Sequence, residues 1–329
     1  MKAESEYSYP PLSEYSEERD GAGHAPLVSI YVSTYNQEEY IRQCLDGILA
    51  QRCPFGVEAL VIDDASTDST PEIILEYARR YPHIIKPVLL TENLYSQRRS
   101  KLREHFLPTA GGKYMAVCEG DDYWTYPGKL AAQVSFLERH PDYAACMHAH
   151  DVRNESSLTY FRYYPQLRHS RRLDLLDLII LQVIQTASAV GRIDVLRDDV
   201  QLKSEAADPE HRFIYDLRIF LSWLNAGRVY AFAGQWSVYR LHDRGVATAA
   251  LIDGTAEARH RRFLDWLGTL YGNKYGHDIA RMHRMWQHLE AWTALRRQKK
   301  YAQAANRIMK ALTTGKTGFL KLYWHRYIY

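Results

Sequence analysis

Residues 114–124 read Tyr-Met-Ala-Val-Cys-Glu-Gly-Asp-Asp-Tyr-Trp, an apolar run that stops abruptly at an acidic cluster. The run predicts a buried strand, and Glu119, Asp121 and Asp122 follow at its carboxyl end. Carboxylates that are removed from water together raise one another's pKa values unless a counter-charge offsets them. Their hard oxygen atoms suit Mg²⁺ or Mn²⁺, and Mg²⁺ also takes water and substrate phosphates as ligands. The cluster therefore predicts a divalent-cation site at the reaction centre.

Apolar strand segments alternate with helical segments on both sides of this stretch. We expect strands at 27–33, 57–63, 85–90, 114–118 and 144–150, and helices at 38–51, 71–81, 96–107 and 129–139. This alternation predicts an α/β fold with a mostly parallel sheet and helices on both faces. The later pattern is less regular, with helices expected at 173–181 and 215–225, short strands at 229–232 and 236–241, and mostly helix over 255–309.

Composition divides the chain into three regions. Residues 1–25 are rich in Pro, Ser, Glu and Gly, which predicts a flexible tail, 26–250 form the main α/β domain, and 251–329 form a helical region. The formal net charge is only +3, so we expect no nucleic-acid partner. No segment approaches the roughly 20 apolar residues of a membrane span. The N-terminus lacks signal-peptide features and the four cysteines form no C-x-x-C pair, which together predict a cytoplasmic protein.

The C-terminal region is basic and aromatic. No acidic residue follows Glu290, and the last residues combine bases with rings: Lys316, Phe319, Lys321, Tyr323, Trp324, Arg326, Tyr327 and Tyr329. This mixture is typical of segments that lie on a membrane surface. Three interpretations stay open: peripheral contact with the inner face of the membrane, a helical cap on the main domain, and a dimer contact.

Polar residues end three of the expected strands: Ser33-Thr34-Tyr35-Asn36, Asp63-Asp64-Ala65-Ser66 and Glu119-Gly120-Asp121-Asp122. Ligands of open α/β sheets bind beyond the carboxyl ends of the strands, so we expect the three groups to line one crevice. Any one group alone has a plainer interpretation, because Asp and Asn often cap the helix that follows.

These positions resemble the family-2 glycosyltransferases, which have a GT-A fold. The resemblance covers about residues 26–245 and rests on four motifs in order: Val28–Asn36, Val61–Asp68, Glu119–Trp124 followed by Lys129-Leu130, and Tyr239–His242. It implies an inverting, metal-dependent transfer of one sugar from a nucleotide-diphosphate sugar, with a UDP-sugar as the first choice. The acceptor would be a hydroxyl of a glycan, a lipid-linked glycan or a protein in polysaccharide or glycoconjugate biosynthesis. Processive members carry Q-x-x-R-W, and Gln235–Arg240 lacks that spacing, which favours a non-processive enzyme.

The resemblance also implies roles for individual residues. The nucleotide sugar would be held by Thr34, Tyr35, Asn36, Asp64 and Asp121. Asp122 and His242 would meet Mn²⁺ or Mg²⁺, while Glu119 stands where the family commonly has Asp, so its contact with the metal stays open. Asp216 would be the general base, with Asp208 and Glu210 as competitors. Apart from the resemblance, Arg98, Arg99 or Arg240 could add phosphate contacts near the reaction centre, and the alternative for Arg98 and Arg99 is that they lie on a solvated helix.

Other functions have weaker support. A nucleotide-sugar pyrophosphorylase or a Rossmann dehydrogenase would need a Gly-rich loop after the first strand, where this chain has Thr34, Tyr35 and Asn36. A catalytically inactive glycan-binding or scaffold subunit on the same fold is the alternative that stays open. His148 and His150 alternate along an expected strand, and we interpret them as packing residues rather than metal ligands.

Overall fold

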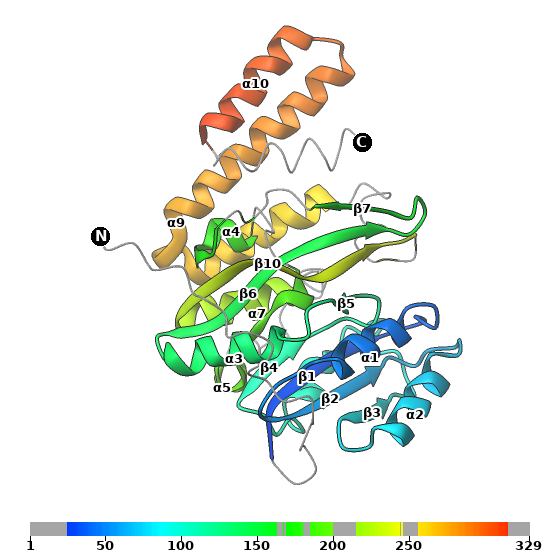
Figure 1. Cartoon of the computed structure of the whole chain (residues 1–329). Coiled ribbons are helices and arrows are strands. Elements are labelled where there is room, and N and C mark those ends of the chain that lie inside the picture. The colour runs from blue at the N-terminus through cyan, green and yellow to red at the C-terminus, as the bar shows by residue number, and fades with distance from the viewer. Residues whose placement is uncertain are drawn as a thin grey trace.

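A ten-stranded mixed sheet forms the centre of the described chain (Figure 1), in the order β3-β2-β1-β4-β9-β6-β10-β5, with β7 beside β6 and β8 beside β10. The computed structural model describes residues 25–162, 167, 169–179, 185–199, 215–243, 245 and 256–314. The strands are β1 (Pro26–Thr34), β2 (Gly56–Asp63), β3 (Ile85–Leu89), β4 (Tyr114–Val117), β5 (Tyr123–Trp124), β6 (Tyr143–Asn154), β7 (Thr159–Arg162), β8 (Arg171–Leu173), β9 (Val190–Arg192) and β10 (Arg228–Leu241). The expected α/β fold is confirmed.

The first half of the sheet is parallel and buried on both faces. β1 pairs in parallel with β2 and β4, and β2 pairs in parallel with β3. Along β1 the side chains alternate: Ile30 and Val32 pack into the cluster with α1 (Ile41–Leu49), α2 (Thr70–Arg80) and α3 (Lys129–Arg139), whereas Tyr31 packs into the cluster on the opposite face. The carboxyl ends of β1, β2 and β4 therefore meet at one edge.

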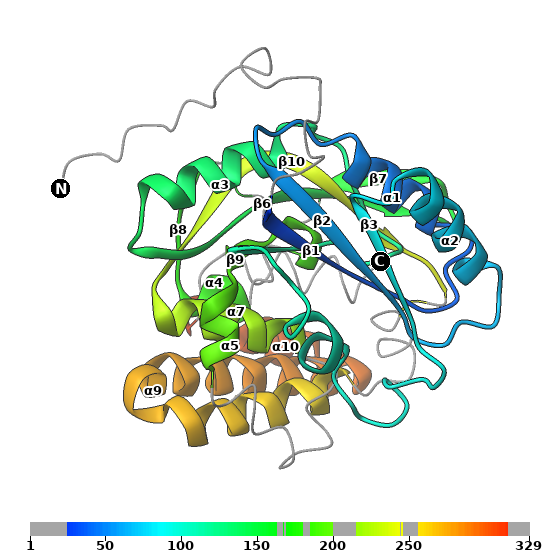
Figure 2. The same ribbon diagram turned by 90° about the horizontal axis from the view of Figure 1, so that it is seen from below.

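Helices cover both faces of the sheet, as Figure 2 shows. α1 buries Ile41, Cys44, Leu45 and Ile48, the i, i+3, i+4, i+7 spacing of one helix face. On the other face lie the π-helical turn η2 (Leu102–Phe106), α4 (Leu175–Ile179), α5 (Ile193–Asp198) and α7 (Tyr215–Ala226). The ring of Tyr31 meets Phe106 edge-on with centroids 5.1 Å apart, which joins β1 to η2.

The second half of the sheet is mixed. β9 runs antiparallel between β4 and β6, β10 runs parallel to β6, and β5 pairs antiparallel with β10. The two short strands expected at 229–232 and 236–241 are one strand, β10. Its pairing with β6 shifts register between Phe232 and Val238, so the polar interruption marks bulges rather than a strand end.

The helix expected at 96–107 is mostly absent, which corrects the sequence prediction. Only residues 101–106 are helical, and the segment before them forms turns in which Arg98 has a φ of 65°. Two backbone amides in this segment, of Leu94 and Tyr95, donate to the Asp64 carboxylate. A long-range contact therefore overrides the local helical pattern.

The C-terminal helices are α9 (Ala256–Arg297) and α10 (Tyr301–Thr314), which confirm the helical pattern. α9 bends back on itself: His283 Nε2 lies 3.4 Å from Asp265 Oδ1, although residues 18 apart in a straight helix are separated by about 27 Å. The first arm buries Phe263 and Leu264 in the cluster that includes Phe220 of α7. The second arm projects away from the sheet together with α10 (Figure 1).

Several expectations fall outside the described residues. They include all but the last residue of the tail predicted at 1–25, the domain boundary at 250/251 and the segment from Lys316 to Tyr329. No described helix combines the length and apolar character that crossing a membrane requires.

Candidate active site

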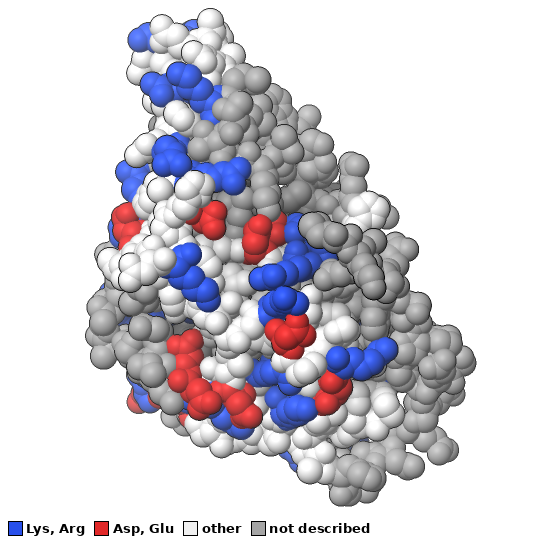
Figure 3. Space-filling model, turned by 90° about the vertical axis from the view of Figure 1, so that its left-hand side faces the viewer, with Lys and Arg blue, Asp and Glu red and all other residues white. Residues whose placement is uncertain are grey.

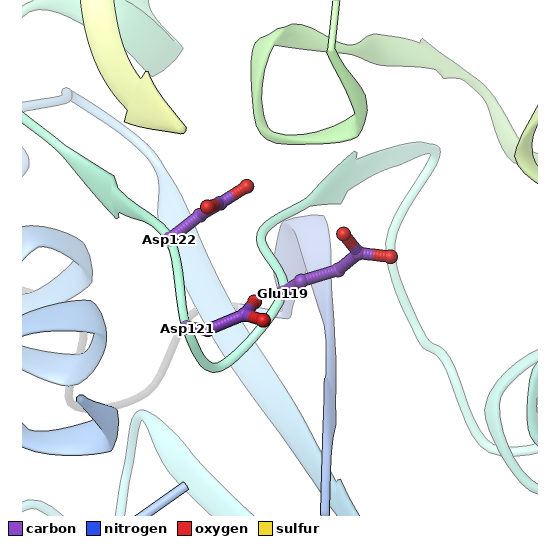
Figure 4. A group of neighbouring side chains, drawn as sticks. All are labelled: Glu119, Asp121 and Asp122. Atoms are coloured by element: carbon purple, nitrogen blue, oxygen red, sulfur yellow. The ribbon is translucent and has the colours of Figure 1, made fainter. Parts of the chain in front are cut away.

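The acidic cluster occupies the turn between β4 and β5. Glu119, Asp121 and Asp122 each place one carboxylate oxygen within 4.8 Å of the others, and their side chains leave the turn on the same side (Figure 4). Glu119 Oε2 accepts a hydrogen bond from Thr186 Oγ1 at 3.1 Å. Within the described residues, these three acids form the group whose geometry could hold a metal ion.

Asp122 is the most buried of the three acids, with no exposed surface. Its Oδ1 accepts the backbone N–H of Arg240 at 2.9 Å, while its Oδ2 is buried without a hydrogen bond. Burial, reinforced by the Asp121 and Glu119 carboxylates, raises the pKa of Asp122 well above its usual range. A divalent cation would supply both the missing partner for Oδ2 and the missing counter-charge, so these residues fit Mg²⁺ or Mn²⁺.

His242 lies beside this cluster, directly after β10. Its Nε2 is 3.1 Å from Asp121 Oδ2, and its ring packs on Tyr40 with centroids 4.9 Å apart. His242 is 8% exposed, and its Nδ1 is buried without a hydrogen bond. The structure therefore brings His242 beside the adjacent predicted residues Asp121 and Asp122, although His242 follows Asp121 by 121 positions in the chain.

Arg240 supports the acidic turn from within the protein. It is 4% exposed, and its Nε donates to Glu155 Oε1 at 2.8 Å. Its two terminal nitrogens donate to the Asp121 carbonyl oxygen and to Gln43 Oε1. The guanidinium also lies over the rings of Tyr40 and Tyr123, 5.1 and 4.5 Å from their centroids. All these donors point into the protein, so in this arrangement Arg240 holds the turn and does not offer the phosphate contact that the sequence suggested.

Glu155 and Gln43 are site residues that the sequence did not reveal. Each is far from Arg240 in the chain, and neither belongs to a recognisable motif. The buried arginine in Tyr239–His242 is the one signal that could have prompted a search for them, because a buried guanidinium requires several acceptors.

Asp64 shapes a neighbouring segment. It is fully buried at the end of β2, and its Oδ1 accepts the Leu94 amide at 2.7 Å. Its Oδ2 accepts the Tyr95 amide at 3.2 Å and forms an ion pair with Lys101 Nζ at 3.1 Å. Direct contact between Asp64 and a nucleotide base stays a prediction. The observed role is to fix the segment from Leu94 to Lys101 beside the strand ends.

The residues after β1 lock the strand ends together. Asn36 has a φ of 51°, in the left-handed region that Asn tolerates. The side-chain Oδ1 of Asn36 accepts a hydrogen bond from the backbone N–H of Thr67, and the backbone N–H of Asn36 donates to Ser66 Oγ, both at 2.8 Å. The loop after β1 is thus fastened to the loop after β2. The predicted contact of Asn36 with the nucleotide would have to use its remaining side-chain nitrogen.

Thr34 and Tyr35 differ in what they offer a ligand. Thr34 is 2% exposed, its Oγ1 makes no hydrogen bond, and a Cβ on Gly120 would lie 2.8 Å from its Cβ. Only glycine therefore lets the acidic turn approach the end of β1 so closely. Tyr35 is 45% exposed, so its ring is available to a ligand at this edge.

For Asp216, the predicted general base, the structure describes the position of the backbone only. Asp216 lies in the first turn of α7, and its side chain is outside the description; its competitors Asp208 and Glu210 lie wholly outside the described residues. The assignment of Asp216 stays a prediction.

His148 and His150 are buried on β6, as packing residues would be. His148 Nδ1 lies 2.8 Å from the Ala149 carbonyl oxygen, and its ring packs 5.1 Å from Trp236. Burial lowers the pKa of His150 to about 3, so this imidazole is neutral at ordinary pH. Neither histidine belongs to the metal-binding group found among the described residues.

Comparisons with known proteins place this geometry in a family. The model of glycosyl transferase family 2 matches residues 29–199. An uncharacterized protein of Mycobacterium tuberculosis is 39% identical over 226 residues, which are 69% of this chain and 62% of that relative. The chain thus spans less than two thirds of the relative's length.

Two solved structures are similar in fold. The mannosyltransferase PcManGT from Pyrobaculum calidifontis, in complex with GDP-Man and Mn²⁺, has a TM-score of 0.51 at 18% identity, covering 96% of this chain and 84% of that one. Staphylococcus aureus TarS 1-349, in complex with UDP-GlcNAc, has a TM-score of 0.50 at 20% identity, covering 75% and 74%. With the family match, they show that this chain belongs to glycosyl transferase family 2 and has the GT-A fold.

Proposed function

We propose that the protein transfers a single sugar, with inversion, from a nucleotide-diphosphate sugar to a hydroxyl of a glycan, lipid-linked glycan or protein acceptor. The observation that carries the proposal is the acidic turn, where the buried Asp122 has an unsatisfied oxygen and Asp121 is paired with His242. This turn lies where β1, β2 and β4 end, the place at which α/β sheets bind ligands. The family and the GT-A fold make a nucleotide sugar the ligand of choice.

The donor would lie across the strand ends. Tyr35 offers an exposed ring at this edge, and the hydroxyl of Thr34, the residue before it at the strand end, lies buried without a hydrogen-bond partner. Asp64 and Asn36 hold the surrounding loops, so the edge is organised before a ligand arrives. We favour a UDP-sugar, in line with the UDP-GlcNAc in TarS, although PcManGT holds GDP-Man.

Bond cleavage requires stabilisation of the departing diphosphate. Asp122 and His242 would hold Mn²⁺ or Mg²⁺, and the bound cation would supply Lewis-acid stabilisation of the charge on the diphosphate. Arg240 keeps the turn in place through the Asp121 carbonyl oxygen and the Asp122 carboxylate. Asp216 would take the proton from the acceptor hydroxyl. Attack from the side opposite the leaving group inverts the anomeric carbon.

A donor screen tests the proposal. UDP-, GDP- and other nucleotide sugars are incubated with the protein and Mn²⁺ or Mg²⁺, and melting temperature and nucleoside-diphosphate release are both recorded. We expect one donor to raise the melting temperature only with the cation, and to be slowly hydrolysed. A panel in which no donor changes the melting temperature would refute the donor site. Binding without hydrolysis, and without transfer to any acceptor, would favour the inactive glycan-binding subunit.

A further inference from the structure

The turn that joins α9 to α10 is basic and carries an exposed aromatic ring. Lys299 and Lys300 are exposed in this turn, and Tyr301, the first residue of α10, is 64% exposed. In Figure 3 the outer end of the projecting hairpin shows blue side chains and no red ones among the described residues. We call Lys299, Lys300 and Tyr301 the hairpin tip.

The surroundings of the tip reinforce its positive charge. Residues 291–314 contain six bases and no Asp or Glu, namely Arg296, Arg297, Lys299, Lys300, Arg307 and Lys310. Arg307 and Lys310 are exposed on α10, and burial, followed by the charges of these two bases, lowers the pKa of His288 on α9.

Apolar residues of the hairpin formed by the second arm of α9 and α10 are buried in packing contacts. Trp292 of α9 is 7% exposed and Ala304 of α10 is 2% exposed, and both belong to the same packed cluster. Tyr301 has no comparable cover, although it lies only three residues before Ala304. Because the second arm of α9 projects away from the sheet with α10 (Figure 1), a broad surface could meet the tip without meeting the main domain.

We propose that the hairpin tip docks on an anionic phospholipid bilayer. The two ammonium groups would lie among the lipid phosphates, while the Tyr301 ring would sit at headgroup level with its hydroxyl in water. A lipid surface suits these residues better than a protein partner does. A stable protein interface needs about 800 Å² on each side with an apolar centre, whereas each base interacts with an anionic bilayer separately. The inference is independent of sugar transfer.

Vesicle sedimentation with the full chain tests the docking. The protein is mixed with vesicles of phosphatidylglycerol and phosphatidylcholine, or of phosphatidylcholine alone, at low and high salt. The tip variant is Lys299→Glu/Lys300→Glu, and its matched control is Arg79→Glu/Arg80→Glu, which reverses two adjacent exposed bases on α2. Melting temperatures confirm that both variants fold.

Each base near an anionic bilayer adds about fivefold to binding, so the tip variant should bind phosphatidylglycerol vesicles at least about 25-fold more weakly. The control should stay within about twofold of the wild type. Tyr301→Ser should cause a smaller loss that does not depend on salt. Equal binding to both vesicle types, or equal losses in the tip variant and the control, would overturn the proposal. A tip variant that binds vesicles normally but no longer self-associates in sedimentation velocity would assign the tip to a second copy of the chain instead.

Discussion

The backbone amide of Arg240 donates a hydrogen bond to Asp122 Oδ1 at 2.9 Å, joining the end of β10 to the acidic turn. The second oxygen of Asp122 is buried without a donor. One oxygen is thus fixed by the fold, while the other has no hydrogen-bond partner in the described chain. A substitution at Asp122 should therefore affect the stability of the metal-free protein and the binding of a metal ion in different ways.

Asp122→Asn should separate stability from metal binding. The amide oxygen can still accept the Arg240 N–H, and an amide avoids the cost of burying an ionisable group beside two carboxylates, so the metal-free protein should gain about 1–3 kcal/mol in unfolding free energy. Urea unfolding in EDTA measures this gain. Mn²⁺ should raise the melting temperature of the wild type but not of the variant, and donor hydrolysis should fall at least about 100-fold. Asp142→Asn, at a half-exposed surface ion pair with Arg228, is the control that should change neither. A Mn²⁺ response that survives in Asp122→Asn would place the cation elsewhere.

Arg240→Lys should weaken the support of the acidic turn. An ammonium cannot reach Glu155, Gln43 and the Asp121 carbonyl oxygen together, so we expect a loss of about 2–4 kcal/mol in unfolding free energy. Mn²⁺ affinity, measured by calorimetry, should fall about tenfold or more because the carboxylates lose their fixed positions. Arg228→Lys, on the same strand with a half-exposed ion pair, is the matched control and should stay within about 0.5 kcal/mol. Unchanged Mn²⁺ affinity in Arg240→Lys would show that the guanidinium does not position the cluster.

The spacing of apolar residues in the sequence predicted those helices and strands whose formation depends on neighbouring residues in the chain. Except for the expected helix at 96–107, the expected strands and helices between residues 26 and 139 follow from alternating and helical spacing, and helix 129–139 has the predicted bounds. Sequence patterns fail where distant residues determine the local structure. Asp64 holds the segment after β3 in turns, and β9 is a three-residue strand whose pairing with β4 and β6 leaves no periodic signal in the sequence. The same holds for the site. The motifs reveal Asp121, Asp122 and His242, whereas Glu155 becomes a site residue only through the folded position of Arg240.

Asp216→Asn tests the general base. If this carboxylate accepts the proton of the acceptor hydroxyl, transfer should fall at least about 100-fold while donor and Mn²⁺ affinities stay within about twofold, because the base does not touch the diphosphate. Turnover with saturating donor and titration calorimetry measure the two effects. Asp208→Asn and Glu210→Gln are the comparisons, since both acids precede the same helix in sequence. Unchanged transfer in Asp216→Asn, together with a loss in one comparison variant, would move the base to that residue.

Lys129 is a buried cation without a hydrogen bond. Its Nζ has no hydrogen-bond partner and lies 4.1 Å from the centroid of the Trp124 ring. Burial lowers the pKa of Lys129 from its ordinary value of 10.5 to about 7. Between these two values the unfolded chain binds one more proton than the folded chain, so unfolding free energy rises with pH across this window. At about 1.4 kcal/mol per pKa unit, the buried amine costs several kcal/mol at neutral pH.

Lys129→Met should therefore stabilise the protein, and the gain should depend on pH. The thioether side chain has a similar length and needs no proton or hydrogen-bond partner. We therefore expect a gain of about 2 kcal/mol in unfolding free energy near pH 6.5, where folding of the wild type must either bury a charged amine or deprotonate it. The gain should shrink steadily toward pH 9.5, because the pH then approaches the pKa of the lysine in the unfolded chain and the cost of deprotonating it on folding falls. Urea unfolding of both proteins at several pH values gives the difference directly, which cancels the titration of all other groups. Lys113→Met, at an exposed lysine paired with Glu138, should show no such trend. A gain that is constant with pH would mean that Lys129 keeps an ordinary pKa in the fold.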